Sequence, residues 1–314
     1  MRSIPLRLGT RRSPMAVAQS SRVAAMITER TGCPVELTGI STLGDVSGAD
    51  LVQIGGTGVF VSALRQSLHS GEVDLAVHSL KDLPTGPSPG LALAAVPPRD
   101  DPWDALAGRN GAKLADLPSA ARIGTGSPRR VAQLLILRPD VQPVPIRGNA
   151  GTRLAKMESG QVDAVVLAYA GLARIGRLDV VTQVFEPEEM LPAPGQGALA
   201  VECLISRPEL VEILGCVDDQ ATRAATTAER SLLATLQAGC TAPVGAYAAG
   251  TDALRLDAIV AAANGGTVLR ASASGPADQA ERLGREVAAD LLRRGAGMYT
   301  DVSAGHLSNG DDEK

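Results

Sequence analysis

A pattern of strand, turn and helix occurs twice in this chain and constrains its fold more than any other feature. Residues 6–10 read as a strand that ends in Gly-Thr, and a Ser-Pro pair at 13–14 then opens a helix that continues to about residue 30. Residues 123–125 read as a second strand ending in Gly-Thr, and a Ser-Pro pair at 127–128 opens a second helix. Serine caps a helix N-terminus, and proline fits its first position. The repeat predicts two similar α/β units.

A second repeat supports the same division. The sequence SGEVDLAV at residues 70–77 is echoed by SGQVDAVV at residues 159–166, and each reads as the end of a helix followed by a buried strand. Strands that alternate with helices favour mostly parallel sheets, whose ligands gather at strand carboxyl ends and at the N-termini of the following helices. Helix N-termini carry free N–H groups and partial positive charge. The two Ser-Pro turns therefore predict an anion-binding cleft between the units.

Proline-rich segments indicate where the chain crosses between the two units. The sequence PPRDDP at residues 97–102 indicates the first crossing, and PAPGQG at residues 192–197 indicates the return. Two crossings together make a hinge. We therefore predict a discontinuous first domain, residues 1–98 and 197–216, and an arginine-rich second domain, residues 99–196.

The remaining residues predict a small α+β third domain at residues 217–307. Its expected elements are two long helices and three strands, at residues 220–236, 244–249, 255–262, 267–273 and 276–294. Residues 308–314 are polar and acidic, and we expect them to be disordered.

Basic residues are concentrated in one part of the chain. The formal net charge is −4, but the segment from Arg122 to Arg177 has nine basic and three acidic residues and so carries a charge of +6. Arginine outnumbers lysine 26 to 4, and its planar guanidinium suits carboxylates and phosphates. The segment fits either an anionic ligand or an ordinary solvated face with dispersed charges. An aromatic content of 2% leaves few side chains to stack on bases, so we expect no nucleic-acid partner.

Several other classes of protein fit the sequence less well. The four cysteines, Cys33, Cys203, Cys216 and Cys240, lie far apart without C-x-x-C spacing or neighbouring histidines. We therefore expect no disulfide framework and no metal site. No apolar run approaches the roughly 20 residues that span a bilayer, and the first residues lack the apolar core of a secretory signal. These features predict a cytoplasmic protein with no membrane partner.

Six short motifs carry a resemblance to a known family. They are Thr10-Arg11, VHSLKDLP at 77–84, Arg129-Arg130, RGNAGTRL at 147–154, PGQG at 194–197 and GCTAPVG at 239–245. Their order and spacing resemble those of the porphobilinogen deaminases, also called hydroxymethylbilane synthases, over nearly the whole chain. The resemblance implies a hinged two-domain cleft like that of periplasmic binding proteins, and a third domain that carries a cofactor on Cys240.

The resemblance also implies the chemistry. Members of the family hold a dipyrromethane, made from two porphobilinogen units, on the cysteine through a thioether, and this primer is never released. Each incoming porphobilinogen loses ammonia to give an electrophilic azafulvene, which the free α-position of the terminal pyrrole attacks. After four additions, water releases the linear tetrapyrrole hydroxymethylbilane for porphyrin and heme biosynthesis. The chain is therefore expected to be a transferase, and we expect it to be a monomer.

Site residues follow from the matching motif positions. Asp82 would be the catalytic carboxylate, which stabilises positive charge on the pyrrole rings and manages their protons. Each ring carries an acetate and a propionate, which accounts for the arginines. The primer would be bound by Ser79, Lys81, Asp82, Ser127, Arg129 and Arg130, and the incoming rings by Arg11, Gln19, Arg147, Arg153, Arg174 and Gln196. No motif supports Arg138 or Arg177.

Most of these residues also have an ordinary structural interpretation. Asp82 precedes Pro84 and fits a turn or capping residue, and Cys240 taken alone is more typical of a small buried side chain. Any single arginine is equally consistent with a solvated position, and Phe60 fits either a stack on a pyrrole or a place in the core. The alternative function is a non-enzymatic two-domain protein that binds a small carboxylate ligand, because its cleft would be lined in much the same way.

The sequence departs from the family pattern at three places. Thr57 stands where the family often has lysine, so a charged contact from that loop is not expected. Residues 45–58 are rich in glycine and are predicted to form a mobile cover over the cleft. Gly126 replaces a serine, which removes one hydroxyl contact but keeps both following arginines, and Ala238 replaces a glycine before the motif cysteine.

Overall fold

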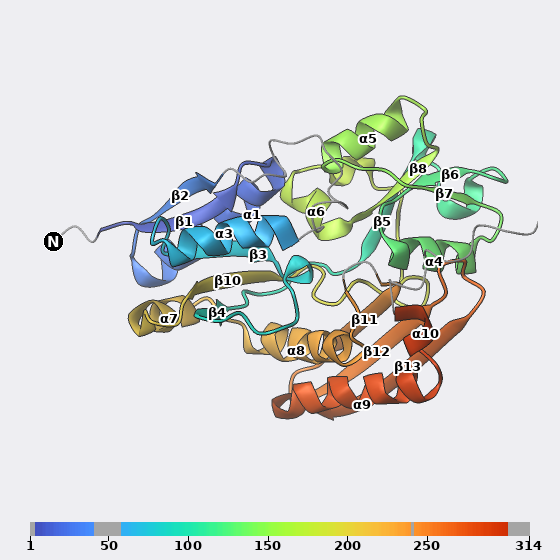
Figure 1. The fold of residues 1–314 in the computed structure, drawn as a ribbon. Helices are drawn as coiled ribbons and strands as arrows, with labels where there is room; N and C mark the ends of the chain where they lie inside the picture. The colour runs from blue at the N-terminus through green and yellow to red at the C-terminus, as the bar shows by residue number, and fades with distance from the viewer. Residues whose placement is uncertain (1–3, 41–57, 240–241, 301–314) are drawn as a thin grey trace, which may run out of the picture.

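Three β-sheets, each with its own helices, organise the molecule (Figure 1). The computed structural model describes residues 4–40, 58–239 and 242–300, with the side chains of the second range described from residue 61. The cover predicted at residues 45–58, apart from the backbone of Gly58, and the tail predicted at 308–314 lie outside these residues. Within the described ranges, no helix is both long enough and apolar enough to cross a membrane.

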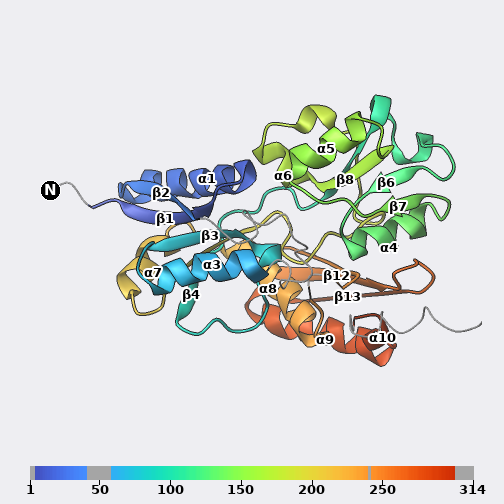
Figure 2. The same ribbon diagram turned by 45° about the horizontal axis from the view of Figure 1, so that its top comes forward.

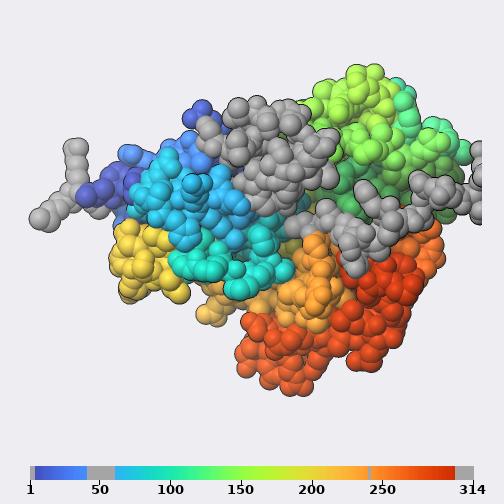
Figure 3. All heavy atoms as spheres, viewed as in Figure 1, coloured from blue at the N-terminus to red at the C-terminus, as the bar shows by residue number. Residues whose placement is uncertain are grey.

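The first sheet has five strands in the order β2-β1-β3-β10-β4. These are β1 (Leu6–Arg11), β2 (Val35–Ile40), β3 (Leu75–Ser79), β4 (Leu91–Ala95) and β10 (Leu199–Leu204). Helices α1 (Pro14–Thr31) and α7 (Pro208–Gly215) cover one face, where Ile27 and Leu214 pack in one cluster with Leu75. Helix α3 (Gly58–His69) covers the other face, where Leu68 packs with Ala76. Figure 3 shows α7, in yellow, beside the blue and cyan N-terminal segments.

The second sheet also has five strands, in the order β7-β6-β8-β5-β9. These are β5 (Asp104–Gly108), β6 (Arg122–Gly124), β7 (Gln142–Val144), β8 (Ala164–Ala168) and β9 (Gln183–Val184). Helix α4 (Pro128–Leu137) covers one face, where Leu134 packs with Ile123. Helices α5 (Ala150–Glu158) and α6 (Tyr169–Arg174) cover the other, where Leu154 and Leu172 pack with Val165.

The two sheets share one topology, which confirms the two similar α/β units that the repeats predicted. Strand β1 is parallel to β2 and β3, as β6 is to β7 and β8. Strand β10 is antiparallel to β3 and β4, as β5 is to β8 and β9. Four of the five strands in each sheet therefore run in the same direction, as predicted, and the exception is the strand that follows a crossing, β10 or β5. Strands β5 and β10 follow the two crossings, so each enters its sheet from the hinge side.

Helix capping follows the predicted signals. The side chain of Ser13 accepts a hydrogen bond from the backbone N–H of Ala16 at 3.3 Å, and Ser127 accepts one from Arg130 at 3.5 Å. Helix α1 ends at Gly32, whose φ of 70° is a left-handed conformation that glycine adopts without steric cost. The two Ser-Pro turns therefore begin helices at the carboxyl ends of β1 and β6, as the repeat requires.

The third sheet is antiparallel and small. Its strands are β11 (Val244–Ala249), β12 (Ala253–Ala261) and β13 (Val268–Pro276), and its helices are α8 (Gln220–Thr235), α9 (Ala280–Arg293) and the short α10 (Gly297–Thr300). Both views place α8 and α9 on the side of the sheet away from α4 (Figures 1 and 2). The two helices pack closely at Gly284, where a Cβ atom would lie 2.3 Å from the carbonyl oxygen of Ala228. The predicted α+β elements are confirmed.

The two crossings lie side by side. The backbone N–H of Asp100 donates to the carbonyl oxygen of Gly197 at 3.3 Å. A Cβ atom on Gly197, whose φ is +87°, would lie 2.5 Å from the carbonyl oxygen of Asp100, so this approach requires glycine. The predicted boundaries of the three domains stay predictions.

A fully buried carboxylate joins several parts of the chain at this point. Glu229 on α8 is 0% exposed, and it accepts hydrogen bonds from Arg99 Nη1 and Nη2 at 2.7 and 3.1 Å. It also accepts from the backbone N–H groups of Gly195, at 2.6 Å, and Ala248, at 2.9 Å. Arg99 Nε donates to the carbonyl oxygen of Gln196 at 2.8 Å. The first crossing, the return, α8 and β11 therefore meet at one side chain.

Arg99→Ala should lower the free energy of unfolding by about 3–5 kcal/mol, because it leaves the charge of Glu229 buried without its cation. Urea unfolding followed by circular dichroism measures this. Arg282→Ala is the matched control, since the Arg282–Glu286 pair is exposed on α9, and it should leave the midpoint nearly unchanged. Equal effects of the two substitutions would contradict the role of Glu229 as a joint.

Candidate active site

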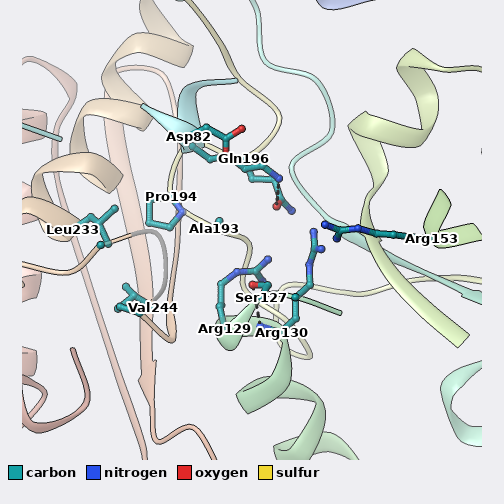
Figure 4. A pocket seen from close by; sticks show the side chains of 14 residues that line it. Asp82, Ser127, Arg129, Arg130, Arg153, Ala193, Pro194, Gln196, Leu233 and Val244 are labelled. Carbon is teal, nitrogen blue, oxygen red and sulfur yellow. Dashed lines mark hydrogen bonds between the residues drawn. The ribbon is translucent and has the colours of Figure 1, made fainter. Parts of the chain in front are cut away.

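Seven of the predicted site residues line one cavity where the three sheets meet. This cavity, called here the central cavity, has a volume of about 240 Å³. Figure 4 shows side chains from all three parts of the molecule converging on it. The predicted residues that line it are Lys81, Asp82, Ser127, Arg129, Arg130, Arg153 and Gln196.

Two smaller cavities, each of about 180 Å³, adjoin the central cavity and share residues with it. The first-sheet cavity is lined by Arg11, Ser13, Gln19 and Ser79 and shares Asp82 with the central cavity. The second-sheet cavity shares Lys81, Arg130 and Arg153 with it and includes Gly148 and the N-terminus of α5. Ser13 and Ser127, which cap α1 and α4, therefore line two neighbouring cavities that share Asp82. This agrees with the predicted cleft between two helix N-termini.

The end of β3 positions Lys81 and Asp82. A short 3-10 helix, η1 (Leu80–Asp82), follows the strand directly. Leu80 and Leu83 are buried on either side of the two polar residues, at 0% and 4% exposure. The backbone N–H of Leu80 donates to the carbonyl oxygen of Ala198 at 3.0 Å. The two leucines anchor the turn in the core, and the polar side chains between them face the cavities.

Asp104 is a central charge of the site, and no sequence motif pointed to it. It is the first residue of β5 and is 0% exposed. Its Oδ1 accepts hydrogen bonds from Arg130 Nε and Nη2 at 3.0 and 2.7 Å and from Gln196 Nε2 at 2.9 Å. Its Oδ2 lies 2.7 Å from Arg129 Nη1. Burial by itself raises the pKa of Asp104, but Arg129 and Arg130 outweigh burial and hold this pKa well below its usual range.

Arg129 and Arg130 are held by further bonds to the backbone. Both lie in the first turn of α4 and are nearly buried. Arg129 Nη1 donates to the carbonyl oxygen of Leu191 at 2.7 Å, and Arg130 Nη1 donates to that of Val166 at 3.0 Å. Burial lowers the pKa of Arg129, although a guanidinium stays charged in proteins. Both predicted primer-binding arginines are thus fixed in place by the protein itself.

Lys81 and Arg153 add two more cations from different elements. Lys81 Nζ donates to Gln196 Oε1 at 3.3 Å. Burial, with a contribution from Arg130, lowers the pKa of Lys81 to about 8, against an opposing effect of Asp82. Arg153 on α5 donates from Nε to the carbonyl oxygen of Gly148 at 2.9 Å. Figure 4 shows the guanidinium groups of Arg130 and Arg153 pointing toward one another, so positive charge is concentrated here.

The structure places two predicted substrate-binding residues outside these cavities. Arg174 donates from Nε to Asp100 at 2.8 Å and from Nη2 to the carbonyl oxygen of Gly197 at 2.6 Å, next to a separate cavity of about 400 Å³. Arg147 is exposed and lines none of the cavities described above. The roles assigned to both stay predictions.

The remaining predicted side chains have clear positions. Gln19 is buried and donates from Nε2 to Ser79 Oγ at 2.9 Å, which keeps both beside the first-sheet cavity. Arg138 pairs with Asp140 at 2.8 Å, and its Nη1 donates to the carbonyl oxygen of Leu114, so its bonds are structural. Arg177 pairs with Asp179 on the surface.

The predicted attachment residue, Cys240, lies outside the described residues, as does the side chain of Phe60. Gly239 and Ala242, on either side of residues 240–241, line the central cavity. Among the described residues, no group of three or more His, Cys, Asp or Glu side chains is placed to hold a metal ion.

Similar folds occur among solved structures of binding proteins. The methionine-binding protein MetQ is similar over 67% of this chain and 88% of its own, with a TM-score of 0.43 and 11% identity. A periplasmic substrate-binding protein of an ABC transporter from Coxiella burnetii is similar over 70% of this chain and 94% of its own, with a TM-score of 0.43 and 14% identity.

Similarity to curated proteins is far higher and covers nearly the whole chain. A porphobilinogen deaminase of Thermobifida fusca is 57% identical over 97% of this chain and 99% of its own length. Porphobilinogen deaminase 1 of Streptomyces coelicolor is 52% identical, and a porphobilinogen deaminase of Mycobacterium tuberculosis is 49% identical, each over 93% of this chain. The matches cover 96% of the Streptomyces coelicolor protein and 97% of the Mycobacterium tuberculosis protein.

Two family models account for the three sheets. The model described as "Porphobilinogen deaminase, dipyromethane cofactor binding domain" matches residues 6–212, and "Porphobilinogen deaminase, C-terminal domain" matches residues 224–293. The alternative of a non-enzymatic binding protein is not favoured by these matches. The motifs, the cavity that they line and the two models agree, and the chain belongs to the porphobilinogen deaminase family.

Proposed function

We propose that the central cavity is the active site in which this chain builds hydroxymethylbilane on a covalent dipyrromethane. Membership of the family makes the chain a transferase that condenses porphobilinogen, with release of ammonia, in porphyrin and heme biosynthesis. One observation carries the assignment of the site. Gly239 and Ala242, which flank residues 240–241, line the same cavity as Asp82. A thioether on Cys240 would place the cofactor beside the proposed catalytic carboxylate.

The residues of the central cavity fit a dipyrromethane, because its two rings carry several carboxylates. Lys81, Arg129, Arg130 and Arg153 supply positive charge, and Ser127 supplies a hydroxyl. Arg129 Nε is buried and has no hydrogen-bond partner among the described residues, so a donor remains to be satisfied. Ligand carboxylates would satisfy such donors and offset the excess positive charge. When bound, the dipyrromethane supplies a pyrrole ring whose free α-carbon joins the next unit.

Asp82 is proposed to stabilise positive charge on the reacting rings. Both the loss of ammonia and the formation of the C–C bond put positive charge on a pyrrole, and a carboxylate beside the ring N–H groups lowers that energy. Asp82 lines both the central cavity and the first-sheet cavity. It therefore lies at the boundary between the proposed cofactor site and a proposed site for the incoming ring. There, one carboxylate can accept hydrogen bonds from the N–H groups of both rings.

The two flanking cavities are proposed to bind the incoming rings. Arg11 and Gln19 would bind carboxylates in the first-sheet cavity, and Arg153 would do so in the second-sheet cavity. Gln196 reaches the site through its bond with Lys81. Because both cavities share lining residues with the central one, a growing chain could extend from it in two directions.

Arg147 and Arg174 remain proposed substrate contacts, but each side chain would have to change its position to reach a ligand. Arg147 precedes Gly148, which lines the second-sheet cavity, so its side chain can reach a ligand only by turning inward. Arg174 pairs with Asp100, and it would have to leave this partner to bind a ring. We also propose a cytoplasmic monomer with no nucleic-acid partner, and the domain boundaries predicted above.

Cys240→Ala should fold but carry no covalent pyrrole, because the variant lacks the sulfur that forms the thioether. Intact mass and the colour reaction with Ehrlich's reagent measure this. Cys33→Ala is the control and should keep both signals. A pyrrole group still bound covalently to Cys240→Ala would contradict the proposed attachment.

Asp82→Asn should keep the shape of the cavity and reduce turnover by about 10²- to 10³-fold, the usual loss for one electrostatic contact to a transition state. With limiting porphobilinogen, the wild-type protein should show a ladder of masses, each step one porphobilinogen less ammonia. Primer-loaded Asp82→Asn should stay near its starting mass. Asp179→Asn, an exposed control, should climb as the wild type does. If Asp82→Asn climbs at the wild-type rate, another residue is the catalytic carboxylate.

Arg153→Leu should lose far more activity than Arg177→Leu. Loss of a charge-assisted contact to a ligand carboxylate costs about 1.5–3 kcal/mol, whereas Arg177 pairs with the surface carboxylates of Glu158 and Asp179. Steady-state kcat/KM for porphobilinogen measures the difference. Equal losses in the two variants would show that Arg153 does not bind substrate.

A further inference from the structure

Asp104 acts on the site only through the residues that it holds. Its two oxygens are engaged by Arg129, Arg130 and Gln196, and it is not among the residues that line the central cavity. An isolated buried carboxylate is costly unless its partners are fixed in good geometry. Here the partners are themselves proposed ligand-binding groups. The charge of Asp104 is therefore placed to organise them.

The bonds of Gln196 continue the network from the second sheet to the first. Its Nε2 donates to the carbonyl oxygen of Pro102 at 2.7 Å and to Asp104 Oδ1 at 2.9 Å. Both protons of the amide are thus used, which fixes its orientation. Its Oε1 then faces Lys81 Nζ at 3.3 Å. The position of Lys81, on η1, is in this way linked to Asp104, on β5.

Asp104 and two backbone carbonyl groups also hold the guanidinium groups of Arg129 and Arg130. Arg130 uses Nε and Nη2 on Asp104 and Nη1 on the carbonyl oxygen of Val166. Arg129 Nη1 donates to the carbonyl oxygen of Leu191, and it forms an ion pair with Asp104 Oδ2 at 2.7 Å. A rigid guanidinium loses little entropy when a carboxylate binds to its remaining donors.

We propose that Asp104 is a positioning residue for the reaction, which aligns Arg129, Arg130 and, through Gln196, Lys81 to receive the carboxylates of the pyrrole chain. The proposal rests on the proposed function of the central cavity. Asp104 itself would contact neither cofactor nor substrate. Asp104 also offsets part of the positive charge that these cations share.

The electrostatics of Lys81 supports this role. Burial and Arg130 lower its pKa to about 8, whereas Asp104 acts in the opposite direction. Because the folded-state pKa of this amine is depressed, its charge is present below about pH 8 and is lost as the pH rises through that value. Removal of the negative charge on Asp104 should depress the pKa of Lys81 further.

Asp104→Asn tests the proposal with three readouts, beside Asp104→Glu and Asp163→Asn. Intact mass reports the covalent pyrrole, steady-state kinetics separates KM from kcat, and NMR of 13C-dimethylated lysines titrates Lys81. The chain has only four lysines, which makes the last assignment practical. The titrations are done on the Cys240→Ala background, so that ligand carboxylates do not contribute. Asp163 is the matched control, because it also pairs with two arginines, Arg109 and Arg122, and none of the three residues lines the central cavity or the two beside it.

Asp104→Asn should raise KM by about tenfold or more, as for the loss of one charge-assisted contact, because Gln196, a proposed contact of the incoming ring, loses its bond to a charged partner. The change in kcat should be smaller. The Lys81 midpoint should fall by about one pH unit. Asp104→Glu keeps the charge but moves it, so it should raise KM without lowering the Lys81 midpoint. This variant tests the positioning role if Asp104→Asn does not fold. Asp163→Asn should change neither quantity.

Failure of the proposed function and failure of the positioning role would give different results. A wild-type protein without a covalent pyrrole would overturn the proposed function itself. A wild type that carries the pyrrole, together with Asp104 variants whose KM and Lys81 midpoint equal those of wild type, would overturn the positioning role alone.

Discussion

The buried carboxylate of Glu229 holds the parts of the molecule in the arrangement that the site requires. A carboxylate at 0% exposure must be fully partnered, and Glu229 takes its partners from both crossings and from β11. Arg99 also lies over the ring of Tyr247, 5.2 Å from its centroid, and Trp103 packs on the same ring at 4.6 Å. The third sheet, and with it the segment that leads to Gly239, is thereby fixed against the cleft.

The sequence predicted the elements of the fold well but not the direction of every strand. Serine caps, Pro at the first helical position and Gly32 in a left-handed conformation are local signals, so α1 and α4 begin where the repeat indicates. Strand direction in β5 and β10 depends on how the chain crosses between the two sheets. No local pattern encodes that path, which explains why the one antiparallel strand in each mostly parallel sheet was not predicted.

The site was predictable to the extent that motifs carry it. The motif around Lys81 and Asp82 lies at the end of a buried strand, and the structure brings it together with the two arginines of α4 in one cavity. Asp104 was missed because its partners lie 26 and 92 residues away in the sequence, where spacing gives no signal. A carboxylate at the start of an apolar strand was the only local sign. Arg174 was assigned from the resemblance to the family, and in the structure its guanidinium pairs with Asp100.

The proposed function requires that the pyrrole chain extends from Cys240 into the central cavity. A crystal structure of the protein purified with its covalent group tests this most directly. We predict continuous density from the Cys240 sulfur into the cavity between Asp82 and the α4 arginines, with ring N–H groups facing Asp82 and ring carboxylates on Arg129 and Arg130. A pyrrole group attached elsewhere, or one whose carboxylates point away from the arginines into solvent, would contradict the account.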